Sequence, residues 1–166
     1  MALLQIQDKF TIEVPSKNGE NEIIEGYLAP VSKQFLKDIK KKYDKQTKEA
    51  QKLKKENNEL IRLNQKISNL DKQIEASESE EKLQLLKEQQ ALTELAYELS
   101  DKVEEASTKM QEFDPYEAKA FEHIENRVAS DKQKRIIELC EKYGYALILN
   151  TINKDIEEGK QKEEND

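Results

Sequence analysis

The chain has few of the side chains on which most enzyme and metal sites depend. Its 166 residues include one cysteine, one histidine and no tryptophan. A single thiol can neither form an internal disulfide nor supply the paired thiolates of a structural zinc site. A single imidazole likewise leaves little scope for metal coordination or a catalytic triad. We therefore expect a protein that is not an enzyme and that needs neither a metal nor a cofactor.

Long apolar runs are also missing from the sequence. A transmembrane helix needs a stretch of about 18 or more apolar residues, and the chain contains none. Its first residues lack the basic and apolar regions of a secretory leader. We therefore expect a cytoplasmic protein that does not bind a membrane.

Charged residues slightly outnumber hydrophobic ones in this chain. They make up 38% and 36% of the sequence, and only four glycines and three prolines interrupt it. Globular proteins average about 25% charged and about 45–50% apolar residues. Such a composition cannot fill a thick core and is typical of long, solvated helices with narrow apolar stripes. The composition predicts a mainly α fold.

A β pattern is confined to residues 6–30. Apolar residues alternate from Phe10 to Val14, and a second apolar run covers residues 22–28. The Asn18-Gly19 pair between them suits the positive φ angles of a tight turn. This pattern predicts a β-hairpin. Because an isolated hairpin is barely stable in water, we expect it to pack on the following helix or on a second copy of the protein.

A long helix is predicted from Lys33 to about Ala76. Pro30 ends the hairpin segment, Ser32 is a suitable N-cap, and neither glycine nor proline interrupts the helix. Over its distal half, apolar residues recur in steps of three and four, which is typical of a coiled-coil seam. These seam residues are Leu53, Leu60, Leu63, Ile67, Leu70 and Ile74.

A second long helix is predicted after a break at residues 76–80, where Ser77 and Glu80 match a capping box. It runs to about Glu112 and has its own seam. That seam consists of Leu85, Gln89, Leu92, Ala96, Leu99, Val103, Ala106, Met110 and Phe113. Two seamed helices joined by a few residues predict an antiparallel coiled-coil hairpin. An alternative stays open, in which one continuous helix pairs with a second copy as a parallel rod.

The remaining sequence predicts a small helical bundle. Asp114-Pro115 is a helix start, and the helix that follows runs to about Ala129. Ser130 or Asp131 caps another helix, which ends at Gly144. A last helix covers residues 145–156, although residues 145–149 alone could form a buried strand.

Four segments result from these patterns. We expect an N-terminal β-hairpin at 1–31, a coiled-coil hairpin at 32–113, a C-terminal helical bundle at 114–157 and a disordered tail at 158–166. The tail is predicted because no apolar residue follows residue 156.

Lysine is concentrated between Lys33 and Lys55. This stretch has ten lysines and three acidic residues, a net charge of +7, whereas the whole chain has a net charge of −7. Binding of nucleic acid through this basic stretch is an alternative function. Its residues of interest are Lys37, Lys40, Lys41, Lys42, Lys45 and Lys48. The stretch has no arginine and the chain is acidic, so we favour pairing with acidic protein surfaces.

His123 and Cys140 are the single representatives of their residue types. A metal site at His123 would need carboxylates such as Glu125 to converge on it, so we expect an ordinary half-buried or surface histidine. A catalytic thiol needs a nearby base, and His123 lies on another predicted helix. We expect Cys140 to pack as a small apolar side chain.

Apolar side chains at the two ends of the bundle are the predicted contact surface for a protein partner. They are Phe10, Ile12, Ile23, Tyr27 and Phe35 near the hairpin, and Tyr145, Leu149 and Ile152 near the C-terminus. Each of these residues could equally belong to the core. Because two long helices with narrow seams leave wide polar faces, we also expect a homo-oligomer.

The layout of the first 40 residues resembles that of the tail-assembly chaperones of contractile-tailed phages and prophages. The resemblance rests on three stretches: Phe10 to Val14, Asn18-Gly19-Glu20, and Tyr27 to Pro30 followed by Phe35 to Ile39. It implies a non-enzymatic assembly factor. Such a factor shields the apolar helices of a tape-measure protein while the tail tube polymerises. The resemblance implies no catalytic residues.

Overall fold

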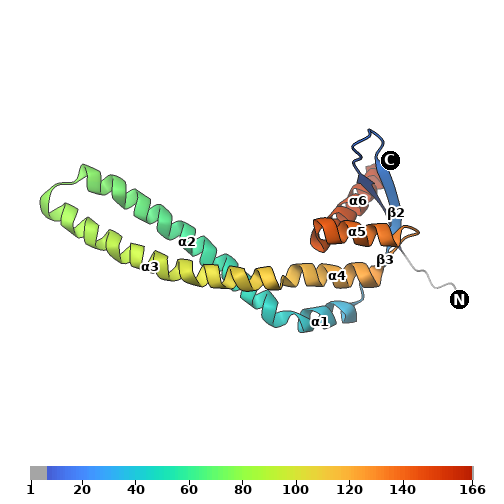
Figure 1. Cartoon of the computed structure of the whole chain (residues 1–166), viewed down its shortest axis with the longest axis horizontal. Coiled ribbons are helices and arrows are strands. Elements are labelled where there is room, and N and C mark those ends of the chain that lie inside the picture. Colours follow the sequence, from blue (N-terminus) through green and yellow to red (C-terminus); the bar gives the residue numbers. More distant parts are fainter. Residues whose placement is uncertain (1–6, 166) are drawn as a thin grey trace. The chain divides into compact units, whose positions relative to one another are not determined.

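A computed structural model describes residues 7–165 of the chain (Figure 1). These residues form two compact units. Residues 7–44 and 115–165 make up the first, which we call the compact unit, and residues 45–114 make up the second, which we call the arm. Most of the chain is helical, as the composition predicts. Residues 1–6 of the predicted hairpin domain and Asp166 of the predicted tail lie outside the described residues.

The predicted hairpin is confirmed. Strands β1 (Asp8–Val14) and β2 (Glu22–Leu28) pair antiparallel, and Gly19 in their turn has a φ of 89°. Cross-strand pairs such as Phe10 with Gly26 face the core, since side chains alternate along a strand. A Cβ at Gly26 would lie 2.5 Å from the Phe10 ring, so glycine is required where this ring crosses the sheet.

A third strand, β3 (Val128–Ala129), was not predicted. It pairs antiparallel with the end of β2, placing Ala129 opposite Tyr27 and Val128 opposite Leu28. The preceding helix α4 (Pro115–Arg127) therefore ends before Ala129, where we expected it to end. A two-residue strand is too short to show an alternating pattern, and its pairing depends on residues about 100 positions away.

Helices complete the compact unit. They are α1 (Lys33–Lys42), α4, α5 (Gln133–Tyr143) and α6 (Tyr145–Asn165). Ser32 caps α1 as predicted, because its side chain accepts the N–H of Phe35. Residues 145–149 are helical, so the strand alternative is wrong for them. The core lies between the inner face of the sheet and helices α4, α5 and α6. Its buried members include Ile24, Leu28, Ile124, Ile136, Leu139, Ile148 and Ile152.

Two boundaries in the C-terminal region differ from the prediction. Helix α5 begins at Gln133, since the Ser130 hydroxyl donates to the Glu25 carbonyl and does not cap a helix at this point. Helix α6 continues through residues 158–165, where we expected a disordered tail. Lys160 lies on this extension and forms a 3.3 Å ion pair with Asp8. This ion pair connects the polar end of α6 to β1, a contact that the composition of residues 158–165 does not predict.

The arm is the predicted antiparallel hairpin. Figure 1 shows α2 (Asp44–Ala76) running out and α3 (Ser79–Glu112) running back beside it. The Gln89 amide of α3 donates to the Ile67 carbonyl and to Asp71 of α2. Leu70, Ile74 and Ala96 are buried along the predicted seams. The alternative of one continuous helix is therefore wrong.

Two local details of the long helices also differ from the prediction. The first helix is interrupted at Tyr43, whose side chain is buried and whose hydroxyl donates to Glu122. The capping box at Ser77 is absent, because the Ser77 hydroxyl donates to the Gln73 carbonyl and closes α2 instead. Ser79 opens α3 with a φ of 56°.

Candidate protein-binding surface

The outer face of the sheet carries two of the predicted contact residues. Ile23, Glu25 and Tyr27 of β2 alternate with the buried residues and so point away from the core. Ile23 is 56% exposed and Tyr27 is 46% exposed. Between them, Lys9 of β1 forms a 3.6 Å ion pair with Glu25. This outer face therefore presents two apolar side chains on either side of a charged pair.

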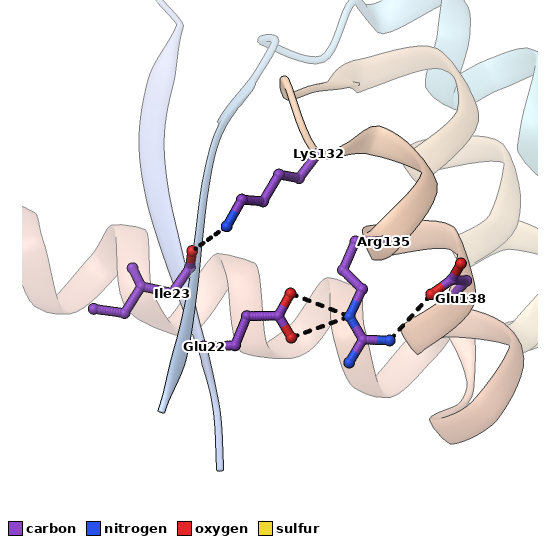
Figure 2. Close-up of polar contacts among 5 residues, drawn as sticks. All are labelled: Glu22, Ile23, Lys132, Arg135 and Glu138. Carbon is purple, nitrogen blue, oxygen red and sulfur yellow. Dashed lines mark hydrogen bonds and ion pairs between the residues drawn. The ribbon is translucent and has the colours of Figure 1, made fainter. Parts of the chain in front are cut away.

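Side chains from the start of α5 cover the edge of β2 (Figure 2). The Lys132 ammonium donates to the Ile23 carbonyl over 3.1 Å. The Arg135 Nε donates to both oxygens of Glu22, at 3.2 and 3.1 Å, and its Nη1 donates to Glu138 at 3.1 Å. The bonds from Lys132 to the Ile23 carbonyl and from Ser130 to the Glu25 carbonyl occupy two backbone acceptors that a further strand would need.

Helix α6 covers part of the β1 edge in a similar way. The Thr11 N–H donates to the Asp155 carboxylate over 2.8 Å, so this outward backbone donor is already bonded. Strand addition, in which a partner pairs with an exposed sheet edge, would have to displace these side chains. The outer face is therefore the more accessible contact surface of the sheet.

Three of the predicted contact residues belong to the core. Phe10 is 1%, Ile12 is 4% and Ile152 is 0% exposed. Burial inside the compact unit leaves these side chains no surface to offer a partner. Tyr145 and Leu149 are partly buried against the same core, and the Tyr145 ring contacts Phe121 edge to face at 5.2 Å.

Phe35 lies at the contact between α1 and α4. Its ring meets the His123 ring edge to face at 5.3 Å. The Arg127 guanidinium donates to His123 Nδ1 over 2.8 Å and to the Ala29 carbonyl over 2.8 Å. Because an arginine can only donate, Nδ1 is the acceptor and the imidazole is neutral. Burial first, and then the positive charge of Arg127, lowers the pKa of His123. The histidine is half-buried, as expected.

The basic stretch is divided between the two units. Lys37, Lys40 and Lys41 are exposed on α1 in the compact unit, whereas Lys45 and Lys48 are exposed on α2 in the arm. Lys42 is bonded to Glu122, which also accepts the Tyr43 hydroxyl. These two hydrogen bonds lower the pKa of Glu122, and the bond to Glu122 raises the pKa of Lys42. One of the predicted lysines thus pairs with an acidic surface of its own chain.

A contact that was not predicted from the sequence orders the start of α6. Glu117 of α4 accepts the N–H of Tyr145 over 2.7 Å and the N–H of Ala146 over 3.1 Å, and so caps α6 from another helix. Gly144 has a φ of 101°, and a Cβ there would lie 3.2 Å from the Glu117 carboxylate. Local signals point to a helix start at this glycine, but nothing near it in the sequence identifies Glu117.

Cys140 packs in the core, as predicted, and is 1% exposed. Burial, followed by the negative charges of Glu117 and Glu141, raises the pKa of its thiol to about 11. The thiol is therefore protonated at neutral pH. Within residues 7–165, no group of three or more histidine, cysteine and acidic side chains is placed to hold a metal ion.

In the part of the chain that the structure describes, no helix is both long and apolar enough to cross a membrane. Comparison of the sequence and fold with family models, curated proteins and solved structures finds no match.

Proposed function

We propose that this protein is a non-enzymatic assembly factor that holds a protein partner on the outer face of its sheet. The observation that carries the proposal is the exposure of Ile23 and Tyr27 on that face. The side chains around β2 support it, because they cover the strand edge and leave the face open.

The size of the face fits a reversible contact. Full burial of a large apolar side chain contributes about 1.5–3 kcal/mol, so two half-exposed side chains supply roughly that amount together. The Lys9–Glu25 pair between them provides charges at the rim of such a contact. A face of this kind suits a partner that is held during assembly and then released.

The more specific form of the proposal is a phage tail-assembly chaperone. Its support is the resemblance in the hairpin, Pro30 and the start of α1, and the hairpin is also the element that carries the outer face. In this form, the partner is a tape-measure protein whose apolar helices are shielded until the tail tube assembles.

An aggregation assay tests the proposal. The client is a synthetic peptide with a tape-measure-like apolar helical repeat that scatters light as it aggregates. We expect the protein to suppress scattering and the double variant Ile23→Thr, Tyr27→Thr to lose most of this effect, because threonine keeps the strands but removes apolar area. The double variant Tyr143→Ala, Leu147→Ala is the matched control, since these side chains are 50% and 55% exposed outside the sheet.

Suppression that survives loss of Ile23 and Tyr27, or that is absent in the unaltered protein, would contradict the proposal. Circular dichroism of each variant checks that the fold is kept.

A further inference from the structure

The two flanks of the arm differ sharply in charge. In the heptads of the seams, Leu53, Leu60 and Ile67 of α2 and Gln89 and Ala96 of α3 occupy position a. Positions e and b then fall on one flank of the antiparallel pair, which we call the e/b flank, and positions g and c fall on the other, the g/c flank. Partial burial of the e residues Thr93, Ser100 and Ser107 agrees with this assignment.

Charged residues are scarce on the e/b flank. Over residues 47–75 and 83–111, four of its 18 residues are charged, namely Lys54, Asp71, Glu75 and Glu104. On the g/c flank, eleven of 16 residues are charged, six from α2 and five from α3. A helix pair surrounded by water has no reason to separate its charges in this way. One flank has the composition of a surface that another protein covers.

Exposed apolar side chains gather on the same flank. Among the described arm residues before Phe113, the large exposed apolar side chains are Ile61, Leu83, Leu86, Leu95 and Tyr97. Four of these five are at positions e or b, and Tyr97 is 70% exposed. Only Leu95 is on the g/c flank. Water contact of four large apolar groups is unfavourable, so their clustering indicates burial in an assembly.

The register of the hairpin shows which residues lie at the same level. Gln89 bonds both Ile67 and Asp71, so it lies beside the helical turn between them. Counting forward along α3 and back along α2 from this point places Ile61 level with Tyr97. The same count places Lys54 level with Glu104, about ten Å further from the hairpin turn.

We propose that two copies of this chain pair through their e/b flanks and form a four-helix bundle. The two-fold axis runs parallel to the arm, so both hairpin turns lie at one end and α2 of each copy faces α3 of the other. Each Ile61 then packs against Tyr97 of the second copy, and each Lys54 pairs with Glu104 of the second copy. A two-fold interface uses the same surface of both copies, so that surface must be complementary to itself. The pairs Ile61 with Tyr97 and Lys54 with Glu104, which lie at the same level along the arm, meet this condition.

Charge complementarity favours a second copy as the occupant through one level pair, Lys54 with Glu104. The other charged residues of the flank, Asp71 and Glu75, are both acidic. The proposed arrangement sets this lysine of each copy against this glutamate of the other. An arrangement with the hairpin turns at opposite ends would instead place α2 against α2 and α3 against α3.

The available area is sufficient for a stable dimer. Helices of this length extend about 50 Å, and a flank two helices wide measures about 20 Å across. The resulting face of about 1,000 Å² per copy matches the size of specific protein interfaces.

Sedimentation and cysteine cross-linking of the full chain test this proposal. We expect a mass twice the 19.4 kDa of one chain. Tyr97→Glu places a charge in the interface and should weaken the dimer about tenfold or more. Leu95→Glu is the matched control, because it lies two residues away on the g/c flank and should leave the dimer unchanged. Circular dichroism shows whether both variants stay helical.

Disulfide formation distinguishes the arrangements. The double variant Ile61→Cys, Tyr97→Cys should form a covalent dimer on oxidation, whereas neither single variant should. Buried Cys140 remains as it is in every variant. A covalent dimer from Ile61→Cys alone would favour opposed hairpin turns and overturn the proposed axis. A monomer at all concentrations, or equal effects of Tyr97→Glu and Leu95→Glu, would overturn the dimer itself.

Discussion

Removal of the Glu117 carboxylate should loosen the start of α6. This side chain bonds two backbone N–H groups of the first helical turn, at Tyr145 and Ala146. Neither group has an acceptor within the helix, since the first turn of any helix leaves its donors without intrahelical partners. In Glu117→Ala, both donors lose this acceptor at a site that is partly shielded from water.

The expected loss follows from the cap and from its charge. Loss of an N-cap acceptor destabilises a protein by about 0.5–2 kcal/mol. A negative charge at a helix N-terminus contributes about 0.3–1 kcal/mol more. We therefore expect Glu117→Ala to lower the free energy of unfolding of the compact unit by about 1–3 kcal/mol. Glu117→Gln should lower it by roughly half as much, because the amide oxygen can still accept one N–H but has no charge.

Denaturant unfolding followed by circular dichroism measures this loss, and hydrogen exchange locates it. The amides of Tyr145 and Ala146 should exchange faster in Glu117→Ala than in the unaltered protein. Glu125→Ala removes an exposed carboxylate from the same helix and serves as the control, with an expected change below about 0.5 kcal/mol. Equal unfolding free energies of Glu117→Ala and Glu125→Ala, with unchanged exchange at the two amides, would refute the capping role.

Three further predictions concern other parts of the chain. Gly144→Ala should lower the free energy of unfolding by about 1–3 kcal/mol, because the φ of 101° strains any residue with a Cβ; an unchanged denaturation midpoint would argue against this. The lowered pKa of His123 means that the folded protein favours the neutral imidazole. The contribution of His123 to the free energy of unfolding is therefore complete above pH 6.5, and it is lost as the pH falls through the lowered pKa. The unfolding free energy of His123→Gln should therefore fall less on acidification than that of the unaltered protein, and identical pH profiles would contradict the lowering of the His123 pKa by burial and by the Arg127 contact. We expect fluorescence anisotropy with a labelled DNA duplex to show only weak binding, and the double variant Lys40→Gln, Lys41→Gln to change that binding little. Tight binding that weakens steeply with added salt and in the double variant would favour the alternative function, nucleic-acid binding.

Elements with a strong local signal were predictable from the sequence. The hairpin has strand alternation on both sides of an Asn18-Gly19 turn, and Gly19 adopts the positive φ that the pair suggested. The two arm helices have heptad seams that extend over many turns, and three of their four buried residues, Leu70, Ile74 and Ala96, are seam residues, whereas the fourth, Ala50, lies outside the seams. In each case, the periodicity and the turn residues that specify the element lie within it, so one window of sequence contains the necessary information.

Roles that depend on distant neighbours were less predictable. Phe10 and Ile152 are apolar residues in regular elements, and nothing local tells whether they cover the core of one chain or contact another. Strand β3 forms because Val128 pairs with Leu28 of β2. The first turn of α6 is ordered because Glu117 of α4 accepts a hydrogen bond from its backbone. The hydrophobic effect is non-directional, so an apolar residue does not specify which surface will bury it. A hydrogen bond between residues far apart in the chain produces no periodic sequence pattern from which it could be predicted.

The sequence by itself determined the mainly α character, the hairpin, the two seams of the arm and the scarcity of metal-binding side chains. These properties follow from composition and from short-range periodicity, which act through local backbone preferences and one-sided burial. Tertiary structure decided which apolar residues became core, that Ile23 and Tyr27 remained on an open face, and that α6 continued beyond its apolar residues. The reason is physical: burial and long-range hydrogen bonding are properties of a pair of surfaces, and only folding brings the second surface into place.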